Sequence, residues 1–286
     1  FEFFCYVDSV RGVDELGDRL DAGWTAGSRP LAVLVEVGVE GGRTGARDAS
    51  QVHDVATAVG RHPSLALVGV AGYEGPFGHD SDAATVAAVR GFVVSLADTL
   101  RDLDAKGLLD DAAREFILTC GGSGHVDAVT SVLAEPANCS RPVRAVLRSG
   151  AYVTHDDGLY AQTSSIAPQL QPAIEVWCQV LSRPEPGLAL LGAGRRDLPF
   201  DSGMPIAKWR WATSSGSVTR LRAEVAEVVK LMDQHAFLEL APSEALEVGD
   251  LVGLGISHPC TAHDKWQMMP LLDDERRVID CVRQYF

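Results

Sequence analysis

A histidine and a cysteine lie two positions apart near the C-terminus, at His258 and Cys260, directly after the apolar run Leu251–Ile256. On an extended backbone the side chains at positions i and i+2 point to the same face, so both could reach one ion. A neutral imidazole and a thiolate together suit zinc better than calcium or magnesium. Two protein ligands would leave coordination positions open for water or substrate, as in catalytic zinc sites. On spacing alone, a buried cysteine beside a hydrogen-bonded loop histidine is the more common arrangement.

The first half of the chain alternates apolar, β-branched runs with helical patterns, and glycine or polar residues follow each run. Such continuous runs are typical of strands buried on both faces of a parallel sheet. The predicted strands cover residues 1–10, 31–39, 65–75, 115–120 and 143–147, and the predicted helices cover 13–22, 49–61 and 82–106. This order predicts a parallel α/β barrel or a doubly wound sheet, whose chemistry lies at the carboxyl ends of the strands.

The pattern changes near residue 165. From Ile174 on, apolar strands are separated by turns that contain Gly and Pro, which predicts a β-rich second domain. We therefore expect one domain over residues 1–165 and another over 166–286. Residues 220–233 have a composition that could form a helix, but the surrounding β-domain favours a strand.

Composition excludes several classes of protein. A hydrophobic content of 46% over 286 residues indicates a globular chain with a sizeable core. The net charge of −14 argues against a nucleic-acid partner, because phosphate binding needs clustered Lys and Arg. We find neither an apolar run of membrane-spanning length nor signal-peptide features at residues 1–8, so no membrane partner is expected. Six scattered cysteines do not suggest a disulfide framework, and we expect a cytoplasmic protein.

The C-terminal stretch GISHPCTAHDKWQMMPLLDDERRVIDCVRQYF resembles the end of the D-serine dehydratase/D-threonine aldolase-like family, and its bacterial D-serine deaminase branch most of all. The resemblance extends over nearly the whole chain. These are pyridoxal-phosphate enzymes of the alanine-racemase type (fold type III), in which a His-x-Cys or His-x-Asp pair binds a metal ion. Cysteine is typical of the zinc-dependent dehydratases, and aspartate of the aldolases. The resemblance therefore implies a Zn²⁺ site at His258 and Cys260 and favours a dehydratase.

The resemblance also implies the architecture. It predicts an alanine-racemase-type (β/α) barrel over residues 1–165, with its N-terminal part missing, and a C-terminal β-rich domain over 166–286 that carries the metal-binding motif. The family's Schiff-base lysine, on the first barrel strand, is expected to lie upstream of this chain. The four lysines present do not match that motif; they are Lys106, Lys208, Lys230 and Lys265.

A glycine-rich turn at Gly122, Ser123 and Gly124 follows a predicted strand and precedes a predicted helix. Such a turn can present backbone N–H groups and a hydroxyl to a phosphate, although many strand–helix loops contain Gly and Ser. The family has its phosphate-binding turn at the corresponding strand end. The resemblance therefore assigns these three residues to binding of pyridoxal 5′-phosphate.

Four further residues are assigned to the cofactor by resemblance. Gly150 and Tyr152 match the family's PGxY turn, which contacts the phosphate, with Ser149 in place of proline. Arg43, in GGRTG, resembles the arginine that faces the pyridoxal ring. Tyr73, in GYEG, stands at a strand end where the family places a residue against the cofactor. Without the resemblance, Arg43 would be interpreted as a surface cation, and a core tyrosine would be almost as common an interpretation of Tyr73.

Three residues are candidates for a substrate pocket. Asp201 matches a family D-x-G-x-P turn, although turn chemistry alone would explain an aspartate there. His235 resembles a family Glu/Gln-His element, whereas lone histidines are more often structural. Asp264 follows the metal pair closely in the sequence.

The resemblance implies a lyase that converts D-serine, or a related D-3-hydroxy amino acid, to a 2-oxo acid and ammonia, and it implies a homodimer. Two alternatives stay open. One is a D-threonine aldolase-type enzyme, which uses a metal ion and pyridoxal phosphate to cleave the Cα–Cβ bond. The other is a non-catalytic protein that binds pyridoxal phosphate, which the absent lysine allows.

Overall fold

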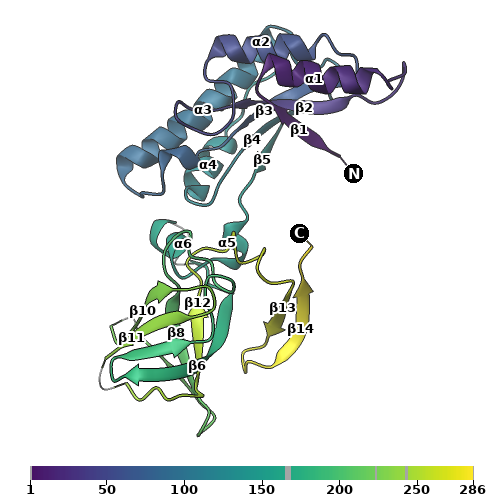
Figure 1. Cartoon of the computed structure of the whole chain (residues 1–286). Coiled ribbons are helices and arrows are strands. Elements are labelled where there is room, and N and C mark those ends of the chain that lie inside the picture. The colour runs from purple at the N-terminus through teal and green to yellow at the C-terminus, as the bar shows by residue number, and fades with distance from the viewer. Residues whose placement is uncertain (1, 165–168, 223, 242–243, 286) are drawn as a thin grey trace. The chain divides into compact units, whose positions relative to one another are not determined.

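The computed structural model describes residues 2–164, 169–222, 224–241 and 244–285 (Figure 1). The chain divides into two compact units, Phe1–Ser149 and Gly150–Phe286. Each unit has a hydrophobic core of its own. The first is an α/β unit and the second is rich in β-strands, as the sequence predicts.

The first unit is built on a five-stranded parallel sheet in the order β1-β2-β3-β4-β5. Its strands are β1 (Phe4–Val7), β2 (Leu31–Val37), β3 (Leu65–Gly72), β4 (Phe116–Cys120) and β5 (Val143–Leu147). All eight residues of the central strand β3 are buried, as expected for an apolar run with packing on both faces. Sequence order equals spatial order throughout these five strands, which is the winding of a (β/α) barrel. A doubly wound sheet would reverse direction at a switch point.

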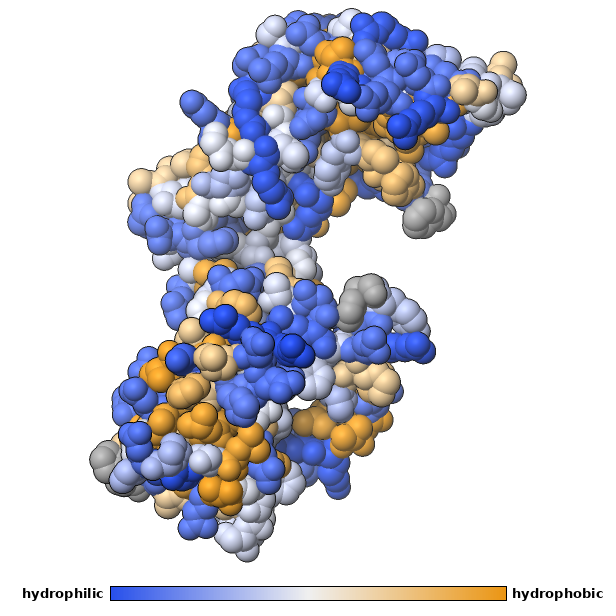
Figure 2. Space-filling model, in the orientation of Figure 1, coloured by the Kyte–Doolittle hydropathy of each residue, from blue (hydrophilic) through white to orange (hydrophobic). Residues whose placement is uncertain are grey.

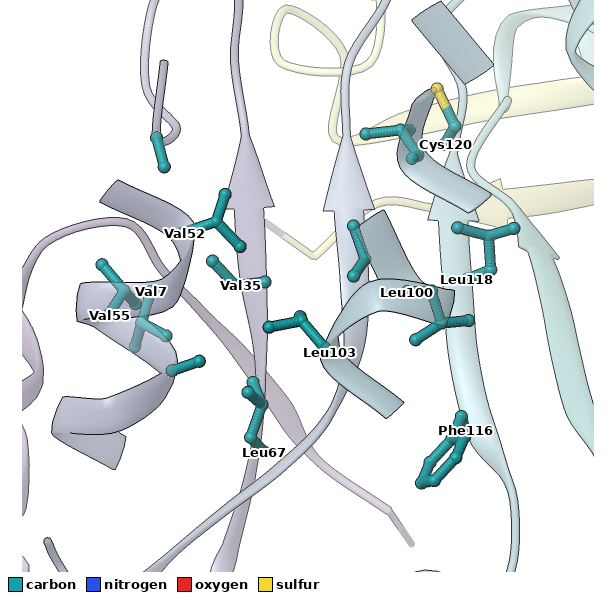
Figure 3. Packing of buried hydrophobic residues seen from close by; sticks show 14 of the residues in the cluster. Val7, Val35, Val52, Val55, Leu67, Leu100, Leu103, Phe116, Leu118 and Cys120 are labelled. Carbon is teal, nitrogen blue, oxygen red and sulfur yellow. The ribbon is translucent and has the colours of Figure 1, made fainter. Parts of the chain in front are cut away.

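Helices cover one face of this sheet because each right-handed crossover leads to the next neighbouring strand (Figure 1). They are α1 (Val10–Asp21), α2 (Ala49–Val59), α3 (Ala83–Ala105) and α4 (Val126–Leu133), with a short 3₁₀ turn η1 (Gly75–Phe77). Side chains such as Val35 and Leu118 from the sheet pack against Val52, Val55 and Leu103 from the helices (Figure 3). The opposite face of the sheet is also apolar, with a smaller cluster that includes Leu34, Val68 and Ile117.

Among the described residues, α3 is the one helix that is long and apolar enough to cross a membrane by length and composition alone. Its buried side chains recur every three or four residues, which is the pattern of a helix that packs one stripe on a core. They are Val89, Phe92, Val93, Leu96, Leu100 and Leu103, all part of the core cluster on the sheet. The packing therefore accounts for the apolar composition of α3.

The second unit contains a seven-stranded sheet in the order β10-β11-β7-β6-β12-β8-β9, with every pairing antiparallel. The strands are β6 (Glu175–Glu185), β7 (Leu188–Leu191), β8 (Ile206–Ala212), β9 (Ser217–Arg220), β10 (Ala226–Leu231), β11 (Ala236–Leu240) and β12 (Leu251–Gly255). Two short helices precede the sheet, α5 (Ala151–Thr154) and α6 (Leu159–Thr163). Within the ambiguous segment 220–233, Ala226–Leu231 form the strand β10, as the β-domain context predicts.

A two-stranded hairpin, β13 (Met268–Leu272) and β14 (Val278–Arg283), ends the second unit. The guanidinium of Arg276, in the hairpin turn, lies 4.9 Å from the ring centre of Trp177 and 4.6 Å from that of Trp209. It also forms an ion pair with Glu175 at 3.0 Å. This clamp ties the hairpin to β6 and β8, while apolar side chains of the hairpin stay exposed (Figure 2).

The boundary expected near residue 165 falls at residues 165–168, which lie outside the described residues. The contacts change earlier, at residue 150. Residues 150–164 belong with the second unit because the backbone N–H groups of Asp157 and Leu159 donate to the carbonyls of Ile256 and Ser257.

Candidate functional site

The metal motif follows the end of the buried strand β12. Ile256, Ser257 and His258 follow the strand and are buried, with a bend at Ser257, whereas Cys260 is exposed. The Nε2 atom of His258 and the Sγ atom of Cys260 lie 2.8 Å apart, so the two donors meet at one point. No third His, Cys, Asp or Glu completes a metal-binding cluster among the described residues. One nitrogen and one sulfur donor, with further coordination positions open, suit a zinc-type ion that also binds water or substrate.

Residues at the start of α6 contact the backbone just before this motif. Besides the two backbone hydrogen bonds to residues 256 and 257, there is a close contact between Gly158 and Ser257. A Cβ atom on Gly158 would lie 2.6 Å from the Ser257 carbonyl oxygen, which is too close for any side chain. The glycine therefore allows the approach that holds Ser257, and with it the neighbouring His258.

The carboxylate of Asp156 lies beside His258. Its side chain is fully buried, and its Oδ2 atom lies 3.4 Å from Nδ1 of His258. Burial lowers the pKa of His258, but the carboxylate of Asp156 and the sulfur of Cys260 outweigh burial and raise this pKa to about 9. Sequence reasoning missed Asp156, because it stands about a hundred residues before the motif and carries no spacing signal.

The candidate pocket residues differ in their relation to the metal motif. The hydroxyl of Thr261, next to Cys260, donates to Oδ1 of Asp201 at 3.1 Å, so Asp201 lies beside the motif. Asp264 is exposed in the turn that follows the motif. His235 is exposed at the turn between β10 and β11, and within the described residues its side chain makes no hydrogen bond or ion pair. Their roles stay predictions.

In the first unit, the carboxyl ends of the strands carry the predicted cofactor residues. The guanidinium of Arg43 lies 4.6 Å from the ring centre of Tyr73. The loop that carries Arg43 is held by Arg47, which donates hydrogen bonds to the carbonyls of residues 42 to 45. Gly45 adopts φ +102° and its N–H donates to Asp8. Arg47, which sequence reasoning did not consider, thus shapes the loop around Arg43.

The turn of Gly122, Ser123 and Gly124 leads into α4, whose first turn has no side-chain cap. Its first backbone N–H groups are therefore available to a ligand, as at phosphate-binding helix ends. A Cβ atom on Gly122 would lie 2.8 Å from both the Tyr73 ring and the Glu74 carboxylate. The glycine thus lets the turn lie directly against these two side chains.

Arg148 is a further residue at this edge that sequence reasoning missed. Its Nε donates to Thr119 Oγ1 at 3.1 Å, its guanidinium donates to the Gly72 carbonyl, and it lies 5.2 Å from the ring centre of Tyr6. These contacts place a cation at the carboxyl ends of several strands, where α/β folds bind anionic ligands. Its position directly after β5 was the available signal.

The first unit has one lysine, Lys106, which follows the end of α3 and donates hydrogen bonds to Asp102 and His53. It belongs to the helical layer. The described carboxyl edge therefore carries Arg43, Arg148 and the uncapped first turn of α4, and Lys106 does not lie beside it. Gly150 and Tyr152, at the start of the second unit, open the four-residue helix α5; their predicted contact with the phosphate stays a prediction.

Comparison with known proteins bears on this geometry. Residues 173–272 match the family model described as a putative serine dehydratase domain. The metal motif of His258 and Cys260 lies inside the matched range. The chain is also 24% identical over 265 residues to 3-hydroxy-D-aspartate aldolase of Paracoccus denitrificans (strain Pd 1222), covering 90% of this chain and 61% of that relative's length.

Solved structures that resemble this chain have the same fold. D-threonine aldolase from Filomicrobium marinum matches with a TM-score of 0.74 and 22% identity, covering 98% of this chain and 68% of that one. D-threo-3-hydroxyaspartate dehydratase from Delftia sp. HT23 matches with a TM-score of 0.74 and 16% identity, covering 99% and 72%. An alanine racemase-like protein from Idiomarina loihiensis matches with a TM-score of 0.69 and 15% identity, covering 98% and 70%. The predicted family resemblance and the alanine-racemase-like fold are confirmed.

Two further matches are mutants of a D-threo-3-hydroxyaspartate dehydratase. One carries a cysteine-to-alanine substitution and is described as the metal-free form. The other carries a histidine-to-alanine substitution two positions earlier. In that enzyme the two substituted residues thus have the same order and spacing as His258 and Cys260 in this chain.

Proposed function

We propose that this protein is a lyase, dependent on pyridoxal phosphate and zinc, that converts D-serine or a related D-3-hydroxy amino acid to a 2-oxo acid and ammonia. The observation that carries the proposal is the distance of 2.8 Å between His258 Nε2 and Cys260 Sγ, within the residues that match the model of a putative serine dehydratase domain. The dehydratase mutants with the same His-x-Cys spacing, one of them metal-free, support a metal ion at this pair. The cysteine ligand favours zinc.

The residues of each unit match one part of this chemistry. Bound pyridoxal phosphate supplies delocalisation of the negative charge that develops on the substrate α-carbon. Gly122, Ser123 and the first amides of α4 would hold its phosphate, and Arg43 and Tyr73 would lie against its ring. Zinc at His258 and Cys260 would supply Lewis-acid polarisation of the β-hydroxyl, which is otherwise a poor leaving group. For D-serine the net products are pyruvate and ammonia, because the water lost on elimination returns when the amine is hydrolysed.

An aldolase is the second candidate, since the chain resembles 3-hydroxy-D-aspartate aldolase and D-threonine aldolase as well as a dehydratase. The same metal pair would then polarise the β-oxygen while the Cα–Cβ bond breaks. The third candidate is a non-catalytic protein that binds pyridoxal phosphate, which the absence of a lysine at the described carboxyl edge of the first unit allows. The homodimer and the cytoplasmic location stay predictions.

Product analysis separates these candidates. The purified full-length protein, supplied with pyridoxal phosphate and zinc, is incubated with D-serine, D-threonine or D-3-hydroxyaspartate. The proposal expects a 2-oxo acid and ammonia in equal amounts, and no product from the L-isomers. Glycine and an aldehyde as the main products would establish the aldolase, and no product from any substrate would favour the non-catalytic candidate.

A further inference from the structure

We propose that Asp156 is a positioning residue for the metal pair. Its buried carboxylate holds the imidazole of His258 through Nδ1, so that Nε2 faces Cys260 and the ion. This inference rests on the proposed metal site. It adds a residue far from the His-x-Cys motif in the sequence to the machinery of that site.

The carboxylate of Asp156 is itself fixed in orientation. Its Oδ1 atom accepts hydrogen bonds from the backbone N–H groups of Gly158 at 3.0 Å and Tyr160 at 2.8 Å. That leaves Oδ2, which points to Nδ1 of His258 at 3.4 Å. Both atoms are buried, and neither makes a hydrogen bond to any described residue. Each is therefore the natural partner of the other.

The contact between Asp156 and His258 affects how strongly Nε2 of His258 can bind a metal ion. A separation of 3.4 Å is just beyond the ordinary hydrogen-bond range of about 2.7–3.2 Å, so a small rotation of the imidazole completes the bond. A carboxylate acceptor keeps the proton on Nδ1, which leaves the lone pair of Nε2 for the ion. The adjacent negative charge also makes Nε2 a stronger donor to a cation. Loss of such an outer partner typically weakens metal affinity by about 10–100-fold.

Asp156 accepts the backbone hydrogen bonds of the turn through Oδ1 and faces His258 through Oδ2, and one substitution can separate these two roles. Asp156→Asn keeps an oxygen for the backbone N–H groups of Gly158 and Tyr160, and so retains the local turn. It replaces the second oxygen by an amide that cannot accept from Nδ1–H. Asp157→Asn is the matched control, because the neighbouring Asp157 is also largely buried but pairs with Lys208 at 3.0 Å. The control removes a carboxylate one position away without touching His258.

The test is the zinc dissociation constant, measured by competition with a chromophoric chelator for the wild type, Asp156→Asn, Asp157→Asn and Cys260→Ala. We expect about 10–100-fold weaker binding for Asp156→Asn and wild-type affinity for Asp157→Asn. Wild-type affinity in Asp156→Asn, or equal weakening in Asp157→Asn, would overturn the inference. Wild-type affinity in Cys260→Ala would instead overturn the metal site of the proposed function, so the two failures are distinguishable.

A second measurement does not depend on the folding of a variant. Nitrogen-15 NMR of the zinc-loaded wild-type protein reports the state of each imidazole nitrogen. The inference expects a metal-bound Nε2 and a protonated Nδ1 in His258. Zinc on Nδ1, or an unprotonated Nδ1, would contradict the positioning role of Asp156.

Discussion

At the residue scale, the candidate metal site depends on contacts with residues outside the His258–Cys260 motif. The spacing of His258 and Cys260 predicted that both donors could reach one point on an extended chain. The two atoms do lie close together, but the segment bends at residues 257 and 259 and turns at 260, so an extended backbone is not the reason. The supporting contacts of Asp156 and Gly158 come from a segment about a hundred residues earlier. Their pairing with the motif is a tertiary contact, which periodicity and motif spacing cannot predict.

We predict that Gly158→Ala destabilises the second unit. A Cβ atom at this position would lie 2.6 Å from the Ser257 carbonyl oxygen, so the backbone on one side must move. Overpacking of this kind costs about 1–3 kcal/mol, and it should also weaken zinc binding, because Ser257 precedes His258. Thermal unfolding of the variant measures the first effect and chelator competition the second. Gly150→Ala is the control, since nothing lies within 4 Å of its added Cβ; equal stability of the two variants would contradict the prediction.

At the element scale, capping residues and hydrophobic periods predict most of the first unit. The helix predicted over 49–61 begins at a capping residue, Asp48, whose side chain accepts from the N–H of Gln51 at 2.8 Å. The strand β3 was predicted from its continuous apolar run, which is typical of a strand packed on both faces. In the second unit the existence of β-strands was predictable, but their order was not. The strand β6 pairs with β12 and β7, and partners distant in sequence have no local signature.

An ion cluster joins α1 to the end of α2 and predicts a pH dependence of stability. His62, largely buried, lies 2.8 Å from Asp21 and 3.2 Å from Asp14, and Gly17 leaves room for its ring. The hydrogen bond to Asp21 is the largest cause of a raised pKa of His62, with burial opposing it and Asp14 adding to it. The folded-state pKa thus lies above the ordinary value of 6.5.

The stabilisation from protonated His62 is therefore fully present below about pH 6.5 and is lost as the pH rises through the folded-state value. We expect the melting temperature of the wild type to fall over this range, and His62→Asn to show a smaller fall. Thermal unfolding at a series of pH values measures this change of melting temperature with pH. His235→Asn is the histidine control and should show the same pH dependence as the wild type. A wild-type slope in His62→Asn would exclude this cluster as the cause.

At the scale of the whole molecule, the family resemblance was predictable from the C-terminal stretch that contains His258 and Cys260, although the chain is only 24% identical to 3-hydroxy-D-aspartate aldolase. The predicted barrel type was confirmed, since five parallel strands follow each other in sequence order. Arg148 was missed because its position after β5 becomes meaningful only when Gly72, Thr119 and Tyr6 from three other strand ends are seen around it. Long-range pairing of this kind is set by the fold of the whole unit.

We propose that His258 and Cys260 hold one zinc ion, and metal analysis of the purified protein tests this directly. Zinc per chain is measured by mass spectrometry of the metal, after dialysis, for the wild type, Cys260→Ala and Cys281→Ala. Cys281 is the matched control because it is also an exposed cysteine and lies on β14, outside the motif. We expect a single zinc ion per chain in the wild type and in Cys281→Ala, and loss of this ion in Cys260→Ala. A zinc content in Cys260→Ala equal to that of the wild type would contradict it.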